Sequence, residues 1–227
     1  MFRRDYIVRM IEDMTQMVAK VLTLKQERKT TEALWEIDEL LNRHFRLNSR
    51  LLNSLSVEDV IELFRIGGGL EVDKLQGVAR MLQEEAGIYI EKNDDYAALS
   101  RLMKALHLYL YAYLHGADRN LLQIMQGIDE VIAAVAAYRL PVKTEYLLLS
   151  YLESAGRFGK AEDSLYRLLD QGEEVADEGC ELYQRLMRTD PNVLELGNLP
   201  LAEVIQGQEE WRNVIAKAKE WKVMLKE

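Results

Sequence analysis

Apolar residues recur every three or four positions along most of the chain, which is the spacing of amphipathic helices. The N-terminal stripe comprises Ile7, Met10, Ile11, Met14, Met17, Val18, Val21 and Leu22. It predicts a long helix over residues 4–27, followed by a second over 30–43. Methionine-rich stripes can bind varied partners, but packing into a core explains this one more simply.

Similar stripes continue through the middle of the chain. They predict helices over 47–55, 56–67, 75–89, 98–114 and 121–138. Ser56 and Asp59 have the form of a capping box at the start of one of them. Residues 98–114 are apolar on nearly every side, which is typical of a central, buried helix. Residues 106–115 also alternate with period two, but a lone strand among helices would leave its backbone unpaired, so we predict a helix.

Residues 142–169 predict two short helices folded back on each other. Tyr146, Leu148, Leu149 and Leu152 share one face of the first helix, and Ala161, Leu165, Leu168 and Leu169 repeat the spacing in the second. Gly156 can close the first helix because glycine adopts the left-handed conformation. The short connection requires the two helices to be antiparallel neighbours.

This hairpin resembles a tetratricopeptide repeat (TPR), a helix-turn-helix unit of about 34 residues. Two further stretches repeat its order of residues, with turns at Arg28 and Asn93. Arg28 lies 65 residues before Asn93, and Asn93 lies 63 residues before Gly156. The members of these stretches are Val21, Leu24, Ala33, Ile37 and Leu40 in the first, and Leu82, Ala86, Tyr89, Ala98, Leu102 and Ala105 in the second. Leu149 departs from the family pattern, which prefers a small residue at that position. The resemblance implies an all-α fold of antiparallel hairpins stacked as a short right-handed α-solenoid, with about nine to eleven helices.

The N-terminal sequence MFRRDYIVRMIEDM and residues 51–93 also resemble a family of uncharacterised helical proteins from Firmicutes. This resemblance implies a helical fold and a bacterial source, and it implies no activity.

The C-terminal region predicts a helix over 174–188, a loop over 192–200 and a last helix over about 208–226. The apolar face of the last helix includes Trp211 and Trp221. We expect one domain over 1–227, with 201–227 as its C-terminal cap. The alternative is that the two tryptophans bind a partner or a membrane surface.

Composition limits the partners. The net charge of −9 and the lack of a lysine or arginine cluster argue against a nucleic-acid partner. The single cysteine, Cys180, fits a reducing compartment, and no uninterrupted apolar run predicts a signal peptide or a transmembrane helix. The expected location is the cytoplasm.

No motif predicts catalysis, a metal site or a cofactor. Gly67, Gly68 and Gly69 are not followed by Gly-Lys-Ser/Thr, so a turn is favoured over a phosphate loop. His107 and His115 are eight residues apart with Tyr111 between them, which favours packing over metal binding. Adjacent carboxylates such as Glu84 and Glu85 point about 100° apart on a helix and cannot share a proton.

The function expected from this pattern is non-catalytic binding of a protein or peptide. In a stack of hairpins the first helices line a concave surface. The residues expected to line it are Arg80, Gln83, Gly87, Tyr146, Ser150 and Glu153. The alternative is a self-associating structural protein, a homodimer without a peptide groove, and an enzyme with a site between helices ranks last.

Overall fold

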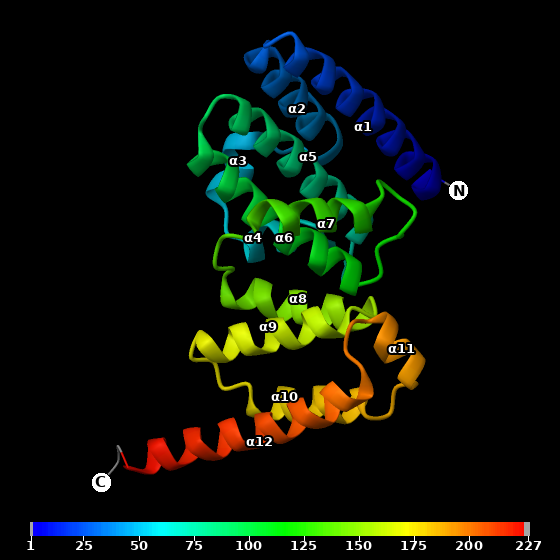
Figure 1. Ribbon diagram of the computed structural model, residues 1–227. Coiled ribbons are helices and arrows are strands. Elements are labelled where there is room, and N and C mark those ends of the chain that lie inside the picture. Colours follow the sequence, from blue (N-terminus) through cyan, green and yellow to red (C-terminus); the bar gives the residue numbers. More distant parts are fainter. Residues whose placement is uncertain (1, 225–227) are drawn as a thin grey trace. The chain divides into compact units, whose positions relative to one another are not determined.

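The computed structural model describes the backbone of residues 2–224 and the side chains of residues 6–216. These residues form twelve helices and one two-stranded hairpin, which confirms the predicted all-α class (Figure 1). The predicted number of nine to eleven helices is too low, because the short helix α11 (Pro191–Leu196) lies where a loop was predicted. The chain divides into two compact units, residues 1–140 (unit 1) and residues 141–227 (unit 2). The single domain over 1–227 stays a prediction. The division follows a helix end and falls just before Pro141, which disfavours helical conformation in the residue before it.

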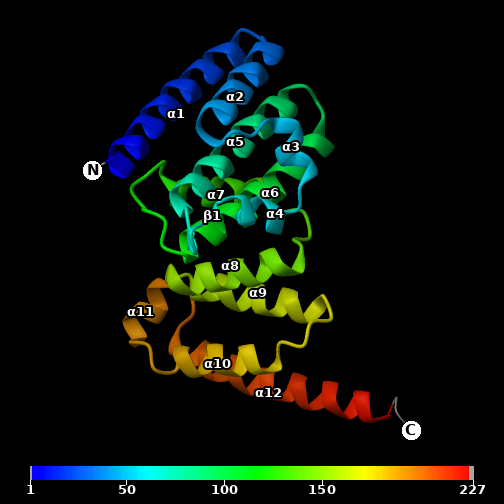
Figure 2. The ribbon, with the colours of Figure 1, turned by 180° about the vertical axis from the view of Figure 1, so that it is seen from behind.

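Unit 1 contains seven helices among its described residues (Figure 2). They are α1 (Phe2–Gln26), α2 (Thr30–Phe45), α3 (Ser49–Ser54), α4 (Val57–Leu63), α5 (Val72–Glu91), α6 (Asp95–Leu114) and α7 (Ile124–Val135). Helices α1 and α2 form one antiparallel hairpin and α5 and α6 form another, and α5 contacts both α1 and α7. The predicted helices over 4–27 and 30–43 are confirmed, with bounds that differ by at most two residues.

The core of unit 1 follows the predicted stripes. Met10, Met14, Met17 and Val21 of α1 are buried, so the methionine stripe packs inside the unit. Helix α6 is buried on several sides and contacts α4, α5 and α7, as its uniformly apolar sequence predicted.

The predicted helix over 56–67 is shorter than expected. Ser56 caps α4 by accepting a hydrogen bond from the Asp59 amide, as predicted, but α4 ends at Leu63. Strands β1 (Arg65–Ile66) and β2 (Gly69–Leu70) then pair antiparallel across Gly67 and Gly68. Both glycines have positive φ, which a two-residue hairpin turn of type I′ requires, and this explains the glycine run.

Helix α7 begins at Ile124, three residues later than the apolar pattern predicted. Leu122 and Gln123 adopt left-handed φ angles of 52° and 50°, so the helix cannot extend back through them. In the loop before α7, the Asp118 amide donates to Asp73 Oδ1 of α5 at 2.9 Å. This hydrogen bond joins the loop to α5.

Unit 2 contains the five remaining helices. They are α8 (Val142–Ser154), α9 (Phe158–Asp170), α10 (Ala176–Leu186), α11 (Pro191–Leu196) and α12 (Leu201–Met224). The predicted hairpin over 142–169 is present as α8 and α9, which contact each other closely. The predicted loop over 192–200 is wrong in its first half, because Asp190 caps α11 and Pro191 occupies its first position. The last helix also begins earlier than predicted, directly after Pro200.

The three predicted turns share one conformation. Arg28, Asn93 and Gly156 have φ angles of 59°, 57° and 70°, and each follows the end of a helix. In each turn the amide of the next residue donates to a carbonyl five residues earlier, as in Lys29 to Leu24 at 2.8 Å and Arg157 to Leu152 at 2.8 Å. This hydrogen bond closes a Schellman-type helix end.

The turn conformation predicts opposite effects for two substitutions. Arg28→Gly should raise the free energy of unfolding by about 0.5–1 kcal/mol, because glycine adopts positive φ without a Cβ clash. Gly156→Ala should lower it by about 1 kcal/mol, and the effect is conformational because a Cβ there meets nothing within 4 Å. Urea unfolding measures both, with Arg9→Gly inside α1 as the control that should lose about 1 kcal/mol. Destabilisation by Arg28→Gly would contradict the assigned turn.

Candidate functional site

The six residues predicted to line a groove lie on two first helices, one in each unit. Arg80, Gln83 and Gly87 belong to α5, and Tyr146, Ser150 and Glu153 belong to α8.

The α5 set is engaged by contacts inside unit 1. Arg80 forms an ion pair with Glu84 one turn later at 2.5 Å. Gln83 Nε2 donates to Glu130 Oε2 of α7 at 2.7 Å, and Gln83 Oε1 accepts from the Tyr109 hydroxyl of α6 at 2.9 Å. Gly87 lies beside Lys25 of α1, whose Nζ would be 3.0 Å from a Cβ at that position.

Tyr109 shows how tightly this region is packed. The side chain is fully buried, and burial raises the pKa of its hydroxyl, a shift that the nearby Arg80 charge partly offsets. Gly127 of α7 packs against that hydroxyl, since a Cβ there would be 2.9 Å from it. The polar side chains of α5 thus hold α6 and α7 in place.

The α8 set lies on a more open surface. Tyr146 and Glu153 are half-buried and Ser150 is exposed, whereas Leu148 and Leu152 on the opposite side of α8 are buried. Arg185 of α10 forms a bidentate ion pair with Glu153. Its Nε donates to Oε1 at 2.6 Å and its Nη2 donates to Oε2 at 3.0 Å. We call this surface, formed by Tyr146, Ser150, Glu153 and Arg185, the α8–α10 face.

Carboxylates border the α8–α10 face near Tyr146. Burial is the largest cause of the raised pKa of the Tyr146 hydroxyl, and the Glu178 and Glu173 charges add to it. The Ser150 hydroxyl donates back to the Tyr146 carbonyl at 3.1 Å. The open end of the face therefore combines an aromatic ring with negative charge.

A buried polar contact fixes α8 against α9. The Glu145 side chain is buried and accepts hydrogen bonds from the Ser164 hydroxyl and from Arg167, the latter with Nε to Oε1 at 2.9 Å. Around it Leu148 and Leu165 are buried in the apolar contact of the two helices. The α8–α10 face therefore lies on a hairpin whose two helices are joined by a buried polar contact.

Trp211 is buried inside unit 2. Its side chain is 1% exposed, and a Cβ at Gly179 of α10 would lie 2.1 Å from its Cε2 atom. The Tyr166 ring of α9 meets it edge-on at 5.3 Å between centroids. Trp221 lies outside the residues whose side chains are described.

A tyrosine–carboxylate pair lies beside Trp211. The Tyr183 hydroxyl of α10 donates to Glu162 Oε1 of α9 at 2.5 Å. Burial raises the pKa of the Glu162 carboxyl, and the hydrogen bond from Tyr183 partly offsets this shift. The pair joins α9 to α10 beneath α12.

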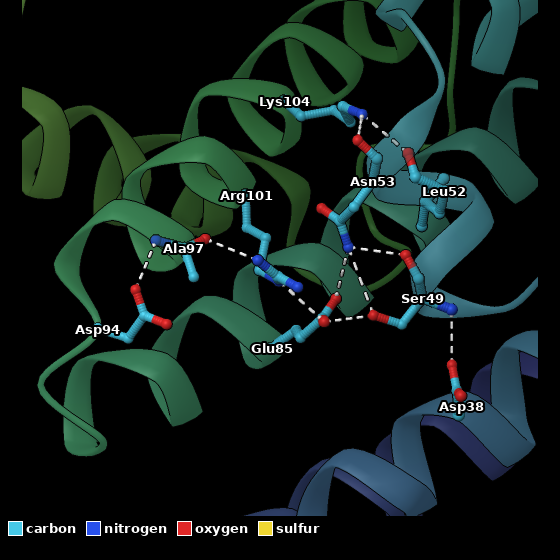
Figure 3. A network of polar contacts seen from close by, with 9 residues as sticks. All are labelled: Asp38, Ser49, Leu52, Asn53, Glu85, Asp94, Ala97, Arg101 and Lys104. Carbon is cyan, nitrogen blue, oxygen red and sulfur yellow. Dashed lines mark hydrogen bonds and ion pairs between the residues drawn. The ribbon is translucent and has the colours of Figure 1, made fainter.

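A polar network in unit 1 has no counterpart in the sequence predictions (Figure 3). Glu85 of α5 is 1% exposed, and its Oε1 lies 2.8 Å from Arg101 Nε of α6. Ser49 and Asn53 of α3 donate to the same carboxylate, Asn53 at 3.3 Å. The network thus ties the short helix α3 to the α5–α6 hairpin.

Lys104 of α6 extends this network. Its Nζ donates to the carbonyls of Leu52, Asn53 and Leu55 at 2.8, 3.1 and 2.6 Å, at the C-terminal end of α3. Burial lowers the pKa of Lys104, and the Arg101 charge adds to this effect. Cations at a helix C-terminus satisfy its last carbonyls, so this contact is structural.

The side chains of His107, Tyr111 and His115 stack in sequence at the C-terminal end of α6. The Tyr111 and His115 rings are stacked at 3.9 Å between centroids, and the His107 and Tyr111 rings at 6.5 Å. Among the described residues, no group of three His, Cys, Asp or Glu side chains is placed to hold a metal ion. In the same part of the chain, no helix combines the length and apolar character needed to cross a membrane.

The described residues define an all-α protein whose antiparallel helical hairpins are closed by left-handed turns, with the polar α8–α10 face in unit 2. Residues 1–215 match DUF6483, a family of unknown function, and the chain belongs to that family. Neither a curated protein nor a solved structure matches the sequence.

Proposed function

We propose that the protein is a non-catalytic interaction module in which the α8–α10 face binds an extended peptide or a partner helix. The observation that carries the proposal is the line of Tyr146, Ser150 and Glu153 along α8, opposite the buried Leu148 and Leu152. A helix with one face in the core and an aromatic, hydrogen-bonding and charged residue on the other is suited to recognition.

The hairpins fit a TPR-like arrangement, which we propose as a short right-handed α-solenoid. The shared conformation of Arg28, Asn93 and Gly156 supports equivalent hairpins. In unit 1, α5 contacts α1, the first helix of the preceding hairpin, and this contact supports the proposal. The lone, half-buried Cys180 suits a reducing compartment, so we propose a cytoplasmic location.

The charges around Tyr146 favour a basic ligand. Glu173, Glu178 and Glu181 border the face from α10 and the turn before it, and Arg185 is already paired with Glu153. A lysine or arginine of the partner would gain ion pairs there and can stack on the Tyr146 ring. Arg80, Gln83 and Gly87 would contribute only if partner binding replaced their contacts in unit 1.

Selection of random peptides displayed on phage tests this proposal. The wild-type protein should enrich lysine- or arginine-containing peptides, and Tyr146→Ala combined with Glu153→Ala should weaken their binding by at least about tenfold. The double variant should keep a melting temperature close to that of the wild type, because both side chains lie outside the core.

Lys160→Ala combined with Asp163→Ala on the exposed side of α9 is the matched control and should bind as the wild type does. Equal binding by the two double variants, or a large loss of stability in the Tyr146/Glu153 variant, would contradict the proposal.

A further inference from the structure

A polar cleft in unit 1 is lined by residues from the turn between α1 and α2 and from the turn between α5 and α6. The two turns lie near each other at one end of unit 1 (Figures 1 and 2). Its volume is about 540 Å³, within the range of small-molecule sites. Its charged lining consists of Lys25, Arg28 and Lys92 with a single carboxylate, Glu91. Such a balance is unusual on a chain with a net charge of −9.

One of the three cations is already neutralised. Lys25 Nζ lies 3.4 Å from Glu91 Oε1, and its side chain is largely buried. It reaches this position across Gly87 of α5, where a Cβ would approach its Nζ to 3.0 Å. Gly87 thus leaves space for the Lys25 side chain, which lines the cleft.

The other two cations are available to a ligand. Within the described residues, neither Arg28 nor Lys92 forms an ion pair with a carboxylate. The Lys92 ammonium lies 5.2 Å from the centre of the Tyr89 ring, a cation–π contact that holds it at the cleft wall. Thr30 and Asn93 add hydrogen-bonding side chains to the lining.

We propose that this cleft binds a phosphate group, with Arg28 and Lys92 as its two cationic ligands. An arginine presents two parallel N–H donors to phosphate oxygens, and a lysine adds a point charge, so the pair matches a doubly charged anion. The polar lining excludes an apolar ligand, because such a ligand would gain little there and would desolvate the charges. The phosphate can belong to a small phosphorylated molecule or to a lipid headgroup.

Isothermal titration calorimetry with inorganic pyrophosphate tests the first source in about 0.15 M salt, where non-specific charge attraction is screened beyond about 8 Å. The wild-type protein should bind pyrophosphate, and Arg28→Gly combined with Lys92→Ala should weaken binding by at least about tenfold. Glycine suits the positive φ of position 28, so this variant should fold.

Lys29→Ala is the matched control, since Lys29 pairs with Glu27 at 2.8 Å and does not line the cleft. Sedimentation with phosphatidylglycerol vesicles, compared with phosphatidylcholine vesicles, tests the second source with the same variants. Loss of binding in the double variant but not in the control supports the proposal and assigns the source. Citrate, an anion without phosphate, is the comparison ligand in the calorimetry. The proposal would be overturned by no binding in either assay, by equal binding of the double variant and Lys29→Ala, or by equal binding of citrate and pyrophosphate.

Discussion

Trp211→Ala should lower the free energy of unfolding of unit 2 by about 3–5 kcal/mol, the range measured for large aromatic side chains removed from cores. Trp211 is 1% exposed and fills the space between Gly179 of α10 and Tyr166 of α9. Its indole N–H also lies 3.4 Å from the Ala176 carbonyl, which would lose this donor. The expected loss would remove a large part of the stability of a small domain.

Trp35→Ala is the matched control for this prediction. Trp35 of α2 is 60% exposed, so its removal should change stability by no more than about 0.5 kcal/mol. Hydrogen exchange measured for each segment of the chain distinguishes the two units. In Trp211→Ala the amides of α9 and α10 should lose protection, while those of unit 1 should keep theirs. A loss below about 1 kcal/mol for Trp211→Ala would show that the tryptophan does not hold α12 in place.

Glu85→Ala should destabilise unit 1 by about 3–5 kcal/mol, because it leaves the Arg101 charge buried without its partner. The carboxylate also accepts from Ser49 and Asn53 of α3, so its removal releases that helix from the α5–α6 hairpin. Urea unfolding measures the effect, and a double-mutant cycle with Arg101→Met isolates the pair.

An exposed ion pair provides the comparison. Arg185 is 51% exposed where it meets Glu153, so Arg185→Ala should cost no more than about 1 kcal/mol. If Glu85→Ala and Arg185→Ala lowered the free energy of unfolding equally, burial would not strengthen the Glu85–Arg101 ion pair, and the prediction would be contradicted.

The sequence predicted those elements whose signal is local. The methionine stripe of α1 and the α8–α9 hairpin follow directly from apolar spacing. The turn at Arg28 was found although arginine is a poor residue for positive φ, because its neighbours repeat the order seen around Gly156. Helix α11 was missed because Asn192, Gly197 and two prolines suggested a loop, while the cap formed by Asp190 and Pro191 was not recognised.

The sequence could not predict contacts that join distant segments. Nothing in the local pattern shows that Glu85 meets Arg101 and Ser49, or that Gln83 is held by Glu130. The same limit explains Arg185, which joins the α8–α10 face only because α10 lies beside α8 in unit 2. Glu181 and Arg185 are one helical turn apart, a local signal of a charged surface on α10 that does not identify the helix facing it.

Hydrogen exchange with and without a selected basic peptide tests most directly the claim that the α8–α10 face is the interaction surface. We predict slower exchange in residues 146–153 and 178–188 when the peptide is bound, with no change in α5 or at the cleft beside Arg28. Protection confined to unit 1, or no protection in α8 and α10 at a saturating concentration of peptide, would contradict it.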